Sequence, residues 1–107
     1  MGYQKLGEVF SKLGKVDDAI RHYRAALAIA EKLAKRSAYD EDRLIHVAEF
    51  NYDLAVNGDD PTRRYALVVE TLTRLPRDLD RREAQLLEDA EVALTKLRRQ
   101  GYGASGG

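Results

Sequence analysis

The sequence predicts an all-α fold built from antiparallel helical hairpins, and three observations support this prediction. Apolar residues recur at helical spacing through most of the 107-residue chain. No stretch of useful length alternates between β-branched and polar residues, as a half-buried strand would. Glycine and proline interrupt the helical pattern at short intervals, so neighbouring helices are expected to fold back on one another. We expect five helices in one domain over residues 1–100.

Two helices make up the first expected hairpin. The first runs over about residues 3–13 and ends at Gly14, a residue suited to a left-handed closing position. The second runs over about residues 17–36, and the adjacent acids Asp17 and Asp18 favour its N-terminus through capping and the helix dipole. The inward stripes are Leu6, Val9, Phe10 and Leu13 in the first helix and Ala19, Ile20, Tyr23, Ala26, Leu27, Ala30, Leu33 and Ala34 in the second.

The second expected hairpin is divided by the turn sequence "NGDDPT". The third helix follows Asp40, its candidate N-cap, and runs to about Val56. Asp60 is then expected to cap the fourth helix, with Pro61 at the first helical position, where its missing N–H costs nothing. The fourth helix runs to about Leu75. The inward stripes are Leu44, Val47, Ala48, Asn51, Leu54 and Ala55 in the third helix and Tyr65, Val68, Val69 and Leu72 in the fourth.

The fifth helix follows Pro76, begins at Asp78 or Asp80, and runs to about Gln100. Its apolar face has a nearly heptad spacing and is too wide to leave in water. It comprises Leu79, Leu86, Ala90, Ala93 and Leu97, widened by Leu87 and Leu94. The mid-helix alanines favour a cap that packs on helices three and four of the same chain, and the alternative is a seam between two copies. Residues 101–107 are rich in glycine and are expected to form a flexible tail.

The composition excludes several classes of protein. The chain has 18 basic and 18 acidic side chains, evenly mixed, which argues against a nucleic-acid footprint and against a basic membrane patch. No apolar run approaches the roughly 20 residues that span a bilayer. Cysteine is absent, which excludes disulfides and thiolate zinc sites and fits a reducing, cytoplasmic setting.

Large and small side chains follow one another in a characteristic order along the first hairpin. From the N-terminus they are Tyr3, Leu6, Gly7, Phe10, Gly14, Ala19, Tyr23 and Ala26. This order and its spacing resemble the 34-residue tetratricopeptide repeat over residues 3–34. The resemblance implies that Gly7 lies against the second helix at Ala19 and Ala26, while Gly14 forms the turn. Over residues 41–75 the resemblance rests on hairpin geometry alone, and the fifth helix is similar to a solenoid cap.

Residues with catalytic or metal-binding chemistry are few, and their positions favour structural roles. His22 and His46 have no second ligand at helical spacing and are expected at the surface or its rim. The acidic clusters at residues 17–18, 40–42 and 59–60 all precede or begin expected helices, where capping explains them. The chain has no phosphate-binding loop, nucleophile elbow or zinc-protease motif. We therefore expect no enzyme activity, no catalytic residue, no cofactor and no metal.

Asn51 is the one amide on an apolar stripe, and two interpretations remain open. A buried amide must find hydrogen-bond partners, so Asn51 is expected to bond to the backbone or to Tyr52 neighbours near the hairpin crossing. Alternatively it faces a ligand and holds a peptide backbone, as asparagines do in peptide-binding tetratricopeptide domains.

The resemblance to tetratricopeptide repeats implies a groove lined by the first and third helices. Its candidate partner-binding residues are Gln4, Glu8, Ser11, Glu49, Asn51 and Asp53. Glu8 would repel a terminal carboxylate, so the carboxylate clamp of that family is not expected, and the acidic lining predicts a basic or polar peptide. The sequence thus predicts a non-catalytic module that binds a partner protein or peptide, or a scaffold for assembly. The alternative is a small structural bundle that acts through homo-oligomerisation.

Overall fold

The computed structural model describes the backbone of residues 14–36 and 41–106, and the side chains of these segments as far as Gln100. The described residues form four α-helices and no strand, which confirms the all-α prediction for this part of the chain. The four helices are α2 (Val16–Arg36), α3 (Glu41–Val56), α4 (Pro61–Thr73) and α5 (Arg81–Gly106). The first expected helix, over residues 3–13, lies outside the described residues, as does the candidate cap Asp40.

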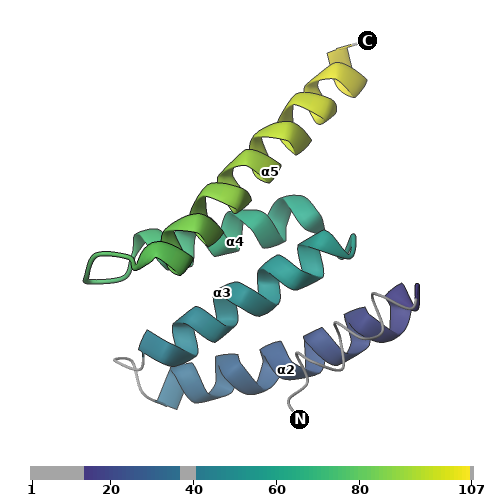
Figure 1. Ribbon diagram of the computed structural model, residues 1–107. Coiled ribbons are helices and arrows are strands. Elements are labelled where there is room, and N and C mark those ends of the chain that lie inside the picture. The colour runs from purple at the N-terminus through teal and green to yellow at the C-terminus, as the bar shows by residue number, and fades with distance from the viewer. Residues whose placement is uncertain (1–13, 37–40, 107) are drawn as a thin grey trace.

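Each described helix packs on the next one along the chain. α2 packs on α3, α3 on α4, and α4 on α5, while α5 also contacts α3. Figure 1 shows α2, α3 and α4 running back and forth, with α5 crossing the end of this stack obliquely. Because α5 has 26 residues and α4 has 13, the C-terminal half of α5 extends past its neighbour. α3 is therefore central and contributes both to the core and to a surface shared with α5.

The core consists of two clusters that meet at α3. Between α2 and α3, Leu54 packs on a small set of α2 residues, namely Ala19, Tyr23 and Leu27. Among α3, α4 and α5, the buried cluster comprises Ala48, Ala55, Tyr65, Val68, Leu72, Leu75, Ala90 and Leu94. The residues that α3 buries in these clusters belong to its predicted stripe, and two of the three are alanines. Small side chains at a crossing let neighbouring helix axes approach closely, so the alanine content of the stripes has a direct structural role.

The apolar face of α5 packs on its own chain. Ala90 and Leu94 are buried in the larger cluster, and half-buried leucines and alanines on either side pack against it. The side of α5 that faces away is mainly polar over residues 81–100, and within this range Val92 is the one large apolar residue that is clearly exposed. This arrangement agrees with the capping alternative, because the face that would form a seam between copies is already covered.

The turn between α3 and α4 closes differently from the prediction. Gly58 adopts a left-handed conformation, and the amides of Gly58 and Asp59 bond to the carbonyls of Ala55 and Leu54 in a Schellman motif. Asp60 also has a positive φ of 50° and makes no side-chain cap. The predicted capping role of Asp60 is therefore wrong. A residue before proline is disfavoured in the right-handed helical region, and the carboxylate of Asp60 instead accepts a hydrogen bond from Arg63.

The two ends of α5 differ in how well the sequence predicts them. At the start, the amide of Glu83 donates to the side chain of Asp80, and the amide of Asp80 donates to the side chain of Glu83. This reciprocal pair is a capping box, and it selects Asp80 from the two expected starting residues. At the other end the backbone stays helical to Gly106, beyond the expected end at Gln100.

None of the helices in the described segments is long and apolar enough to cross a membrane.

Candidate functional site

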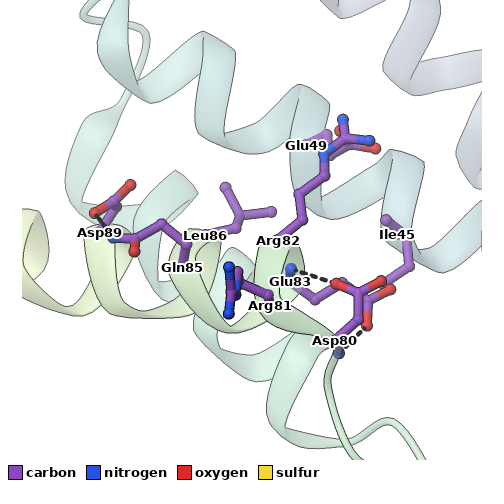
Figure 2. A pocket seen from close by; sticks show the side chains of 9 residues that line it. All are labelled: Ile45, Glu49, Asp80, Arg81, Arg82, Glu83, Gln85, Leu86 and Asp89. Carbon is purple, nitrogen blue, oxygen red and sulfur yellow. Dashed lines mark hydrogen bonds and ion pairs between the residues drawn. The ribbon is translucent and has the colours of Figure 1, made fainter.

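A groove of about 600 Å³ lies between α3 and the first turns of α5 (Figure 2). α3 and α5 both run antiparallel to α4, so they run in the same general direction, and residues one turn apart on each helix face the groove. Its lining residues are Ile45 and Glu49 from α3, and Asp80, Arg81, Arg82, Glu83, Gln85, Leu86 and Asp89 from the start of α5.

The floor of the groove is apolar. Ile45 and Leu86 are both half-buried and pack against the larger core cluster. Each therefore has one side in the core and leaves part of its surface facing the hollow, as Figure 2 shows for Leu86. A half-buried aliphatic floor gives a partner side chain apolar surface to cover, which is the main source of affinity in small grooves.

An ion pair between the two helices crosses the groove. The Nη2 atom of Arg82 lies 2.5 Å from a carboxylate oxygen of Glu49. The two side chains differ strongly in their environment, because Glu49 is 15% exposed whereas Arg82 is 81% exposed. Arg82 thus reaches from the solvent side of α5 onto a carboxylate that is mostly withdrawn from water.

A second ionic cluster fixes one end of the groove. Arg77, in the connection between α4 and α5, donates two hydrogen bonds to the carboxylate of Glu83 at 2.7 and 2.9 Å, and a third to Glu41 at the start of α3. These bonds hold the pKa of Glu83 down at about 2 and raise the pKa of Arg77. The cluster joins the first turn of α5 to the first turn of α3, so it sets how far apart the groove walls stand.

The other charged residues of the groove are only partly matched. Asp89 accepts a hydrogen bond from Gln85 on the same helix. Burial raises the pKa of the Tyr52 hydroxyl, and the negative charge of Asp89 raises it further, which places Asp89 near α3. Arg81 has no ion-pair partner within the described segments. In total the lining holds four carboxylates and two guanidinium groups.

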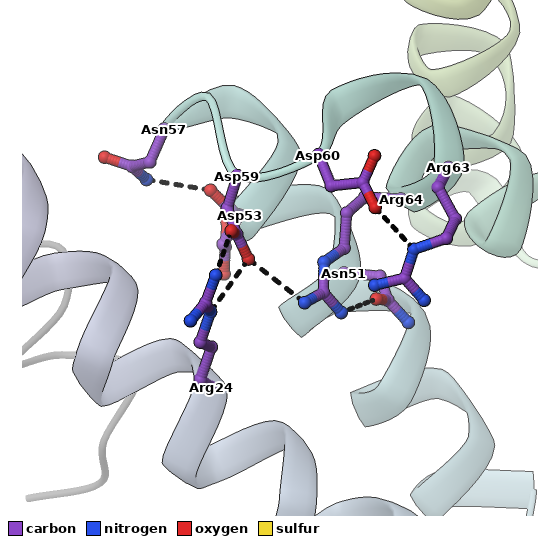
Figure 3. Close-up of polar contacts among 8 residues, drawn as sticks. All are labelled: Arg24, Asn51, Asp53, Asn57, Asp59, Asp60, Arg63 and Arg64. Carbon is purple, nitrogen blue, oxygen red and sulfur yellow. Dashed lines mark hydrogen bonds and ion pairs between the residues drawn. The ribbon is translucent and has the colours of Figure 1, made fainter.

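A polar cluster at the α3–α4 turn holds α2, α3 and α4 together (Figure 3). Asp59 accepts hydrogen bonds from Arg24 of α2 and from Arg64 of α4. The buried Arg64 also donates to the Oδ1 atom of Asn51 at 2.9 Å. The hydrogen bonds from Arg24, followed by those from Arg64, hold the pKa of Asp59 below its ordinary value although burial opposes this. The expected capping role of the residue 59–60 cluster is thus replaced by interhelical ion pairs at Asp59.

The structure separates the predicted partner-binding residues of α3. Glu49 lines the groove. Asn51 is 2% exposed, and its side-chain oxygen accepts a hydrogen bond from Arg64 of α4 rather than from the expected backbone or Tyr52 neighbours. Its side chain is therefore not at the surface. Asp53 is half-buried beside the α3–α4 turn and is not part of the groove lining. The remaining predicted partner-binding residues, Gln4, Glu8 and Ser11, lie outside the described residues.

Of the eight residues on which the resemblance to tetratricopeptide repeats depends, four lie within the described residues and four lie outside them. Gly14 has a φ of 76°, as a left-handed closing glycine should. Ala19, Tyr23 and Ala26 are all buried on α2. Tyr3, Leu6, Gly7 and Phe10 lie outside the described residues.

Neither histidine contributes to a candidate site. His46 is exposed, and its ring lies 6.4 Å from the ring of Phe50 in a tilted arrangement. His22 is half-buried on α2. No group of three or more metal-binding side chains occurs within residues 14–36 and 41–100.

The α5 wall of the groove is the part that sequence reasoning missed. Leu86 was expected to face inward, but nothing in the spacing of Arg82 indicates a partner 33 residues earlier in the chain. The capping signal at Asp80 locates the start of α5, and with it the end of the groove, to within a few residues.

The sequence and the structure were compared with known proteins. No family model, curated protein or solved structure matches the chain. The function proposed below therefore depends on the geometry of the groove and on the residue pattern of the chain itself.

Proposed function

We propose that this protein is a non-catalytic interaction or scaffold module of tetratricopeptide-like type that binds a segment of a partner protein in the α3–α5 groove. The observation that carries this proposal is the groove itself, which has an apolar floor at Ile45 and Leu86 and a charged rim. A concave, mainly apolar surface with a few placed polar groups is the usual form of a recognition site. Residues 14–100 supply both walls from packed helices, so the site is held by a rigid scaffold.

The arrangement of the helices supports the repeat-like part of the proposal. The buried alanines and Tyr23 of α2 occupy positions of the signature, and α3 and α4 form a further antiparallel hairpin that packs on α2 through Leu54. In such a stack, alternate helices line one face, and here α3 and α5 are the alternate helices. We place the module in the cytoplasm, because a chain without cysteine suits a reducing compartment.

Self-association through α5 is the competing proposal, and the packing of α5 disfavours it. Ala90 and Leu94 are buried within their own chain, so pairing of two α5 helices would first have to expose the larger core cluster. We therefore expect the isolated protein to be a monomer that binds a different partner.

Selection of displayed 12-residue peptides on the full chain tests this function. Gln85→Trp fills the groove from an exposed position without entering the core, whereas Arg98→Trp adds the same ring to an exposed position of α5 outside the groove lining. Selected peptides should lose affinity for Gln85→Trp and keep it for Arg98→Trp in fluorescence anisotropy. A selection that yields no binder, or binders indifferent to Gln85→Trp, contradicts the proposal.

A further inference from the structure

The groove lining has more carboxylates than guanidinium groups, and the carboxylates differ in how well they are paired. These differences indicate the chemistry of the partner. Of the four lining carboxylates, Glu83 is matched by Arg77 from outside the groove, and Asp80 is used in the capping box. Glu49 is paired with the exposed Arg82, and Asp89 accepts a hydrogen bond from Gln85 but has no ion-pair partner within the described segments. The lining holds four carboxylates against the guanidinium groups of Arg81 and Arg82, and Arg77 pairs with Glu83 from outside, so the groove keeps a small excess of negative charge. Complementary charge helps to fix the register of a partner.

The pair Glu49–Arg82 can open without disturbing the fold. Arg82 is 81% exposed, and an ion pair at such a position adds little to stability, so its guanidinium can return to water at small cost. Glu49 is only 15% exposed, so its carboxylate is costly to leave unpaired when Arg82 moves away. Glu83 differs, because Arg77 holds it through two hydrogen bonds and the amide of Asp80 through a third.

We propose that the groove recognises its partner through one basic side chain that displaces Arg82 from Glu49, while an adjacent apolar side chain of the partner covers Leu86 and Ile45. The proposal rests on the function proposed above and adds the chemistry of the partner. The incoming cation pairs with Glu49, and Arg82 acts as an internal competitor that the partner must replace. A partner segment that is neutral at this position leaves Glu49 with its own arginine and gains no new contact there.

Matched synthetic peptides test the basic side chain. The probe is a fluorescein-labelled, capped 12-residue peptide of alanine, glutamine and serine with two leucines and one arginine at helical spacing. Two matched peptides carry citrulline or glutamate in place of the arginine, and citrulline keeps the shape of arginine without its charge. The arginine peptide should bind the full chain about tenfold more tightly than the citrulline peptide, as loss of a charge-assisted hydrogen bond implies. Equal binding of the two peptides, or no binding of either, overturns the inference.

Three variants test the displacement of Arg82. Glu49→Gln should weaken binding of the arginine peptide about tenfold, because it removes the receiving carboxylate. Arg82→Gln should strengthen binding about two- to fivefold, because it removes the competitor of a weak exposed pair. Arg98→Gln makes the same change of charge on the same helix, and it serves as the control because Arg98 is exposed and not part of the groove lining.

The sign of the Arg82→Gln effect is decisive. Weaker binding would mean that Arg82 itself contacts the partner, and an effect equal to that of Arg98→Gln would reflect only the total charge of the protein. Either result overturns the displacement. If selected peptides are blocked by Gln85→Trp yet show no preference for a basic residue, the groove still binds partners and only this inference fails.

Discussion

Replacing Glu83 by glutamine should destabilise the protein although it keeps the size of the side chain. Glu83 is 8% exposed and accepts hydrogen bonds from Nη1 and Nη2 of Arg77 at 2.7 and 2.9 Å and from the amide of Asp80 at 3.0 Å. Glutamine presents an amide N–H₂ group where one carboxylate oxygen now accepts, so a donor would face the donors of Arg77. The change therefore breaks the bidentate pair and leaves a cation poorly matched at the first turn of α5.

The expected loss is about 2 kcal/mol in the free energy of unfolding. Hydrogen bonds to charged groups contribute about 1.5–3 kcal/mol, and partial exposure of Arg77 keeps the value below the upper limit. In a domain of this size, such a loss lowers Tm by about 10 °C. Urea unfolding followed by circular dichroism at pH 7 measures it. Glu88→Gln is the matched control, because Glu88 is exposed on the same helix and should change stability by less than about 0.5 kcal/mol.

The same carboxylate gives a prediction for pH. The pKa of Glu83 falls from 4.5 to about 2 in the folded protein. A depressed pKa contributes stability that is fully present above the unfolded pKa of 4.5 and is lost as the pH falls towards 2. The parent protein should thus lose stability over this range more steeply than Glu83→Gln. Equal stability of parent and variant at pH 7, or parallel acid profiles, would refute the role assigned to the Arg77–Glu83 pair.

Three further outcomes follow from the packing. Leu72→Ala, at the centre of the larger cluster, should cost about 2–5 kcal/mol in urea unfolding, and a loss below 1 kcal/mol would mean that the site collapses around the smaller residue. Asn51→Leu removes the acceptor of the buried Arg64 and should cost about 1–3 kcal/mol, while peptide binding by the remaining folded protein stays at the parent level. Light scattering at tens of micromolar protein should give the mass of a monomer, and a mass that rises with concentration would contradict the capping role of α5.

Helix positions and inward faces could be predicted from the sequence because both depend on local chemistry. The bounds of α2 and α3 agree with the expected ones to within about a residue. The buried residues Leu54 and Val68 both belong to predicted stripes. The spacing of apolar residues shows which side of a helix is apolar and therefore buried. That side is the same whichever element the helix packs against. The capping box at Asp80 is equally local, since its two members are three residues apart.

The contacts between elements could not be predicted in the same way. Asp60 carries the expected residue type for a cap, but the turn places its backbone in a left-handed conformation that local composition does not specify. Asp59 pairs with Arg24, 35 residues away, and Arg82 pairs with Glu49, 33 residues away. Such pairs depend on the register of one helix against another, and periodicity leaves that register open. Glu49 was expected in a groove between the first and third helices, whereas the groove that it lines in the described residues lies between α3 and α5.

Two residues of the groove floor also pack against the core. Substituting them therefore changes stability as well as binding, and only variants of the other lining residues are informative about function. Ile45 and Leu86 form the floor and pack against the larger cluster, so shortening either one removes partner contacts and core contacts together. Loss of binding in such a variant would not separate recognition from stability. Glu49, Arg82 and Gln85 reach the groove from its walls without entering either core cluster. Opposite effects of Glu49→Gln and Arg82→Gln on one basic peptide cannot arise from a common loss of stability. Because the two variants also change the net charge in opposite directions, only an effect of Arg82→Gln larger than that of Arg98→Gln reports on recognition in the groove.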